Sequence, residues 1–135
     1  MSEAELQASV AEYIRRAYPD VIFHSDFGSG IKLKPWQAKA QKIQNGGRRA
    51  WPDMFIAEPV GPWHGLFLEL KKEGTRLMKR DCSWASEHIG EQAEMLKELR
   101  RRHYRAYFAV GFDEAINTID TYLGRADKVE ADYGA

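Results

Sequence analysis

The chain has 135 residues, 44% of them hydrophobic, which is enough for one domain with one core. Lysine plus arginine and aspartate plus glutamate each number 20, and this zero net charge neither indicates nor excludes a nucleic-acid partner. The single cysteine, Cys82, excludes an internal disulfide and a cysteine-rich zinc site. No apolar run approaches the roughly 18 residues of a membrane span, and we expect a cytoplasmic protein because no signal-peptide segment is visible.

The N-terminal third predicts a helix followed by a short strand. Ser2 and Glu5 fit a capping box at the start of a helix over residues 2–18, and its apolar positions recur at helical spacing. Residues 21–25 are β-branched and aromatic and predict a strand. Residues 26–30 predict a turn or flexible loop because two glycines occur there.

The middle of the chain predicts a short helix and two strands. Residues 34–44 form the helix, which tolerates a proline in its first turn and is stopped by Asn45-Gly46-Gly47. Its basic residues and flanking glycines indicate a surface insertion instead of a core element. Residues 53–57 and 65–71 predict the strands, which are joined by a connection rich in proline and glycine.

The second of these strands ends in charged residues. Side chains alternate along a strand, so Glu69 and Lys71 share one face, roughly 6–7 Å apart. If the two strands pair as a hairpin, Asp53 and Glu69 converge at one end. Two carboxylates and a lysine at that end indicate a divalent-metal site. The alternatives are an ordinary Glu69–Lys71 ion pair and a turn role for Asp53 after Pro52.

The C-terminal half predicts a polar loop over residues 72–83, a helix ending near residue 103, a strand over 104–110 and a helix over 114–123. Either Ser83 or Ser86 is expected to cap the first of these helices. Gln92 falls within the apolar stripe of that helix, where a glutamine needs a buried partner. We expect residues 1–124 to form a single domain and residues 125–135 a flexible tail.

Basic residues are concentrated between residues 31 and 52, where no acidic residue occurs. The predicted nucleic-acid contacts are Lys32, Lys34, Lys39, Lys42, Arg48 and Arg49, joined by Lys72 and Arg76 from the later loop. Such residues bind phosphates and position a protein without reading sequence, although solvated loop charges are the alternative. Trp36 and Trp51 are candidates for stacking on an unpaired base, with core packing expected for at least one of them.

The ordered set of Pro52-Asp53, Glu69-Leu70-Lys71 and Gln92 resembles the PD-(D/E)XK nuclease superfamily. Within it, the chain resembles the small stand-alone VRR-NUC nucleases of phages and bacteria, from about Glu5 to Leu123. The resemblance implies a restriction-endonuclease-like α/β fold, with an αβββαβ core and a central four-stranded mixed sheet flanked by helices.

The same resemblance implies Mg²⁺- or Mn²⁺-dependent hydrolysis of phosphodiester bonds in DNA. The implied metal ligands are Asp53, Glu69, the Leu70 backbone carbonyl and Glu5, the last directly or through water. Lys71 would orient the attacking water or hold the phosphate, and Gln92 would orient a ligand or a water. Small relatives further imply a homodimer that cuts branched DNA, as a Holliday-junction resolvase does.

Other interpretations of these residues stay open at this point. In one of them Glu5 acts only in the capping box, and Glu12 is then the carboxylate of that helix that would complete the metal site. Gln92 is a core residue bonded to backbone in another. A Cys82–His88 nucleophilic pair is a further alternative. The alternative functions are a non-catalytic protein that binds branched DNA and an RNA endonuclease.

Overall fold

The computed structural model describes residues 1–26 and 33–124. Its elements are α1 (Glu3–Ala17), β1 (Phe23–Ser25), α2 (Pro35–Gln44), β2 (Met54–Ile56), β3 (Leu66–Lys71), α3 (Glu87–Arg101), β4 (Arg105–Val110) and α4 (Phe112–Leu123). This order confirms the predicted sequence of helices and strands. Most of the expected turn after β1, together with Lys32 and the tail over 125–135, lies outside the described residues.

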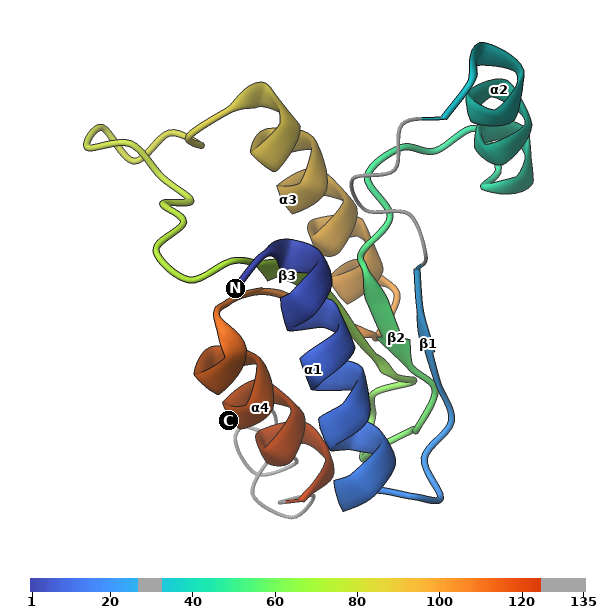
Figure 1. Ribbon diagram of the computed structural model, residues 1–135, viewed down its shortest axis with the longest axis vertical. Helices are drawn as coiled ribbons and strands as arrows, with labels where there is room; N and C mark the ends of the chain where they lie inside the picture. The colour runs from blue at the N-terminus through green and yellow to red at the C-terminus, as the bar shows by residue number, and fades with distance from the viewer. Residues whose placement is uncertain (27–32, 125–135) are drawn as a thin grey trace.

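The four strands form one mixed sheet in the order β1-β2-β3-β4. Strands β1 and β2, and likewise β2 and β3, are antiparallel, whereas β3 and β4 are parallel. The predicted hairpin of β2 and β3 is confirmed, with Met54 opposite Leu68. Helices α1 and α4 cover one face of the sheet and α3 covers the other, so the body has three layers (Figure 1).

Strand β3 supplies side chains to both layers of core. Leu66, Leu68 and Leu70 are at most 1% exposed and pack in the cluster that joins the sheet to α1 and α4. Phe67 points to the opposite face, where it packs with Leu96 and other residues of α3. Each such leucine contributes about 1.5–3 kcal/mol when fully buried, so the strand is held firmly up to its charged end.

The cap of α3 is now defined. Ser86 is the N-cap, and its hydroxyl accepts a hydrogen bond of 3.1 Å from the Ile89 N–H. Ser83 instead donates to Asp81 within the preceding loop. The helix therefore begins at Glu87, so Gln92 lies in its second turn.

Helix α2 confirms the expectation of a surface insertion. None of its residues is buried, and it stands away from the three-layered body (Figure 1). Within the described part of the chain, no helix is both long enough and apolar enough to cross a membrane.

Candidate metal-binding active site

The candidate site begins where the β2–β3 ladder ends. Continuing the register by two residues past Met54 places Pro52 opposite Leu70, and proline has no N–H to donate. The Leu70 N–H of β3 instead donates a hydrogen bond of 2.8 Å to Oδ2 of the Asp53 carboxylate. In a strand, the N–H and the carbonyl of one residue point toward the same neighbouring strand, so the Leu70 carbonyl also points toward β2. Pro52, which lies opposite, has no N–H to donate to this carbonyl.

Glu69 lies beside Asp53 on the sheet face covered by α3. Its side chain is only 4% exposed, and Asp53 is 8% exposed. Burial raises the pKa of Glu69 to about 10, with further contributions from the hydrogen bond to Asp53 and from the negative charge of Asp53. Burial therefore favours the protonated form of Glu69, which is hydrogen-bonded to Asp53.

Lys71 is the third buried charged residue at this strand end, and it is 7% exposed. Its positive charge lowers the pKa of Glu69, which partly opposes the effect of burial. Within the described residues, no ion pair joins its ammonium to Asp53 or Glu69. An ordinary Glu69–Lys71 ion pair is therefore not what the structure contains, and the three ammonium donors stay available.

Gln92 reaches the same face from α3. The side chain is 6% exposed, and its Oε1 has no hydrogen-bond partner within the described part of the chain. A buried amide oxygen normally has a partner, so this one is suited to a cation or a water. The expected burial of Gln92 is confirmed, whereas a backbone partner for its Oε1 is not found.

The structure does not bring Glu5 to this cluster. Glu5 is exposed, its N–H donates to the Ser2 hydroxyl, and its carboxylate accepts from the same hydroxyl at 3.1 Å. Glu12 is held on the outer side of α1 by Arg15 and Arg16. The α1 carboxylate close enough to act on Glu69 is Glu3, whose negative charge raises the pKa of Glu69.

The end of β1 adds a second carboxylate that sequence reasoning missed. The Asp26 N–H donates to the Asp53 carbonyl at 2.8 Å. Burial raises the pKa of the Asp26 carboxyl, and the nearby charge of Asp53 adds to that rise. Gln7 of α1 fixes this corner because its amide donates to the Ser25 hydroxyl at 2.6 Å and to the Asp26 carbonyl.

The donor set fits a hard cation that retains several waters. In residues 1–26 and 33–124, no three or more histidine, cysteine, aspartate or glutamate side chains group closely enough to hold a metal alone. Asp53, Glu69 and the Leu70 carbonyl supply three oxygens, and the free oxygen of Gln92 lies on the same side. Mg²⁺ is commonly held by one or two carboxylates plus water and substrate phosphate, and Asp53 with Glu69 matches that number of carboxylates.

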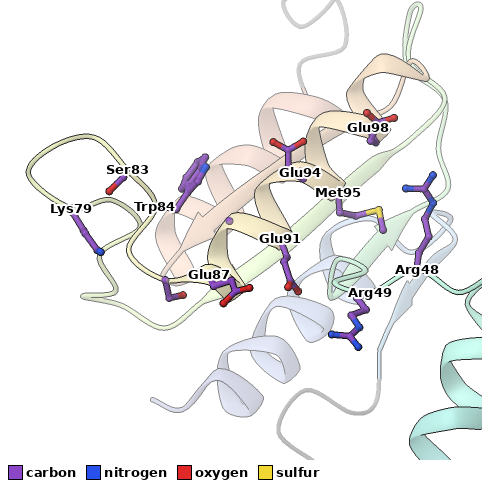
Figure 2. Close-up of a pocket in the computed structure, with 12 residues that line it drawn as sticks. Arg48, Arg49, Lys79, Ser83, Trp84, Glu87, Glu91, Glu94, Met95 and Glu98 are labelled. Carbon is purple, nitrogen blue, oxygen red and sulfur yellow. The ribbon is translucent and has the colours of Figure 1, made fainter.

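The predicted phosphate-binding residues divide into two groups. Lys34, Lys39 and Lys42 are exposed on or beside α2, and Lys72 and Arg76 are exposed on the loop after β3. Arg48 and Arg49, in contrast, line a groove with acidic residues of α3. Figure 2 shows Arg48 extending toward Met95 and Glu98, whereas Arg49 lies nearer Glu91.

The long loop before α3 is anchored by an aromatic contact. Trp84 packs against Phe108 with ring centroids 5.8 Å apart and lies 3.6 Å from the position of a β-carbon built on Gly90. Cys82 in this loop is exposed. The structure shows no hydrogen bond or ion pair between Cys82 and His88 in its described residues, so a nucleophilic pair has no geometric support.

The αβββαβ order around a mixed four-stranded sheet defines a restriction-endonuclease-like α/β fold. A solved structure named "VRR_NUC domain protein" is similar to this chain, with 26% sequence identity and a TM-score of 0.62. The alignment covers 92% of this chain and 89% of that chain. No protein-family model matches the chain, and no curated protein matches it. The structural likeness supports the VRR-NUC family and suggests a nuclease.

Proposed function

We propose that this protein is a Mg²⁺- or Mn²⁺-dependent, structure-selective DNA endonuclease with a role like that of a Holliday-junction resolvase. The observation that carries the proposal is the convergence of two buried carboxylates and a buried lysine at one strand end. The helix that covers this face of the sheet adds Gln92, whose buried amide oxygen has no partner among the described residues. The likeness to a VRR_NUC domain protein supports it independently.

In this proposal Asp53, Glu69 and the Leu70 carbonyl hold the cation. A divalent cation in that position lowers the pKa of water and offsets negative charge on the phosphate. A cation held by these residues would favour the ionised form of Glu69, because its positive charge would oppose the effect of burial, which favours the protonated form. Metal binding should therefore release a proton and strengthen as pH rises.

In the same proposal, Lys71 and Gln92 act on the substrate and its water. Lys71 donates hydrogen bonds either to the scissile phosphate or to the attacking water, since no carboxylate of the described residues is ion-paired with it. Gln92 offers a fixed acceptor oxygen that orients a water or contacts the cation. The negative charge of Glu3 raises the pKa of Glu69, which supports for Glu3 the role on α1 that the family resemblance implied for Glu5.

The test is cleavage of synthetic four-way junction, flap and linear duplex DNA, together with matched RNA, with Mn²⁺, Mg²⁺ or EDTA. We expect metal-dependent cutting of branched DNA that is lost in Asp53→Asn, Glu69→Gln and Lys71→Met. Glu12→Gln is the matched control, because that carboxylate is bound to two arginines away from the site. Undiminished cutting by the three site variants would refute the assignment.

The substrate panel also decides between the alternative functions. Binding to junctions without cleavage under any divalent ion would indicate a non-catalytic DNA-binding protein, and preferred cutting of RNA would indicate an RNA endonuclease.

We further propose a homodimer, for which sedimentation with and without junction DNA is the direct measurement. Tyr107, Phe108 and α4 are its candidate contacts, and Tyr107 and Phe108 are both half-buried.

A further inference from the structure

Helix α2 has no structural role within the body of the protein. None of its ten residues is buried, and the side chains of Trp36 and Ile43 are 68% and 69% exposed. Isolated helices of this length are marginal in water. This one is supported by its ends, where the Gln37 side chain accepts from the Lys34 N–H at 2.9 Å and the Gly47 N–H donates to the Lys42 carbonyl. Such a helix is expected to gain stability from a partner.

The insertion leaves the sheet beside the catalytic residues. On one side it follows β1, whose last residue Ser25 is paired with Met54. On the other side it leads into Asp53, which also receives the Asp26 N–H. Figure 1 shows α2 standing off the body at this edge of the sheet. A ligand bound to α2 would therefore adjoin the candidate active site.

The charge of this insertion is complementary to a polyanion. Described residues 33–52 contain five basic residues, namely Lys34, Lys39, Lys42, Arg48 and Arg49, and no acidic residue. All five are exposed, and none forms an ion pair with a carboxylate of the described chain. Arg48 and Arg49 line the groove with acidic residues of α3, so the three lysines are the cations without nearby acids in that groove. Uncompensated lysines on an unpacked helix favour phosphate over an apolar protein surface as the partner.

Trp36 differs from the other three tryptophans. Trp51 packs on Phe67 at 6.3 Å, Trp63 lies under Arg105 at 4.9 Å, and Trp84 packs on Phe108. Within the described residues, Trp36 alone has no aromatic partner, and it is the most exposed of the four. The structure thus selects Trp36 over Trp51 as the ring available to a base.

We propose that α2 is a recognition arm for unpaired nucleotides in branched DNA, an inference that rests on the proposed function. Trp36 stacks on an unpaired base at or near the branch point, and Lys39 and Lys42, on the same helix, bind the adjoining phosphates. Stacking accepts any base because every base has a π-face, which suits a protein that selects shape instead of sequence. Paired duplex offers no free base face, so Trp36 adds to affinity only for branched DNA that carries unpaired nucleotides at the branch, as a flap does.

The test measures binding in EDTA, so that it does not depend on cleavage or on metal. The probes are a flap DNA with 2-aminopurine at the first unpaired nucleotide and a linear duplex of equal length. We expect quenching of 2-aminopurine by the wild type, and about tenfold weaker flap binding without that quenching in Trp36→Ala. Trp36→Phe should stay within about threefold of wild type, and duplex affinity should change less than about twofold in both variants.

Two further variants control for charge and for general loss of apolar surface. Lys39→Ala with Lys42→Ala should weaken both DNAs and lower the salt dependence by about two phosphate contacts. Ile22→Ala removes an equally exposed apolar side chain, 74% exposed, outside the arm and should change nothing. Sedimentation of Trp36→Ala establishes whether the arm instead contacts a second copy of the chain.

Each outcome bears on the proposal. Unchanged flap binding and quenching in Trp36→Ala, absence of DNA binding by the wild type, or a changed oligomeric state in that variant would each overturn it. If the wild type binds as predicted but cuts nothing with Mn²⁺, the arm is supported and the nuclease proposal fails. If the wild type cuts but Trp36→Ala behaves as wild type, the nuclease proposal stands and the arm fails.

Discussion

Replacing Glu69 with glutamine should stabilise the metal-free protein while removing its response to divalent metal. The pKa of Glu69 is raised from 4.5 to about 10 by burial first and by Asp53 second. Between these two values the folded chain holds a proton that the unfolded chain has released, so the free energy of unfolding falls as pH rises. The stabilising contribution is complete below pH 4.5 and disappears as pH passes through about 10.

The size of this effect on the free energy of unfolding follows from the difference between the working pH and 4.5, the ordinary pKa of a glutamate side chain. At pH 7 the difference is about 2.5 pH units, and each unit corresponds to about 1.4 kcal/mol, which gives about 3–4 kcal/mol of lost stability. Glutamine cannot ionise but has nearly the same shape, so Glu69→Gln should recover about 1–3 kcal/mol at pH 7. For a chain of this length, that corresponds to a rise in Tm of about 4–10 °C.

The assay is thermal and urea unfolding in EDTA at pH 5 and pH 8, followed by the same measurements with Mn²⁺. Wild type should be less stable at pH 8 than at pH 5, and Glu69→Gln should show a smaller decrease. Mn²⁺ at about 100 times its Kd should stabilise wild type by about 2.7 kcal/mol and the variant much less. Glu12→Gln controls for loss of an exposed acid. A variant less stable than wild type at pH 8, or with the same pH slope, would refute the reasoning.

Three further predictions concern neighbouring positions. Gln92→Leu should raise metal-free stability by about 1 kcal/mol, because it removes an unsatisfied buried oxygen, and should weaken Mn²⁺ binding in calorimetry about tenfold. Glu3→Gln should reduce Mn²⁺-dependent cleavage about 10- to 100-fold. Glu5→Gln keeps an acceptor for the Ser2 hydroxyl and should cost only about 0.3–1 kcal/mol of stability through the lost charge near the helix N-terminus; equal activities of the two variants would contradict this assignment. Gly65→Ala should destabilise by about 1–3 kcal/mol in urea unfolding, since its β-carbon would lie 2.7 Å from the Phe55 ring and 2.8 Å from a β2 carbonyl.

The sequence was most informative where periodicity and burial act together. Alternation in β3 predicted that Glu69 and Lys71 share one face, and the hairpin with β2 brought Asp53 to them. The fold class followed because the elements of the three-layered body, which exclude α2, have side-chain periods that match their packing. The role of each site residue stays a prediction, since shape and burial alone do not identify a catalyst.

Residues positioned by neighbouring segments were harder to predict. Glu3 and Glu5 both occur in the first turn of a helix, where an acid is favoured by the helix dipole whatever its function. Helical spacing could have pointed to Glu3, because Glu3 shares a face of α1 with Gln7, four residues later. Gln7 in turn contacts the end of β1. Asp26 had no such signal, since its approach to Asp53 depends on the pairing of β1 with β2.

The separation of α2 from the core has a consequence for how such a protein changes over time. The hydrophobic clusters include no side chain of this helix, so substitutions in it leave the stability of the body nearly untouched. Asp53, Glu69 and Lys71, by contrast, are packed among residues that tolerate little. With α2 as the proposed recognition arm, preference for one DNA shape over another would drift quickly at the insertion while the residues of the candidate site stay fixed. Exchanging this helix among related chains would then alter which branched DNA is bound without rebuilding the candidate site.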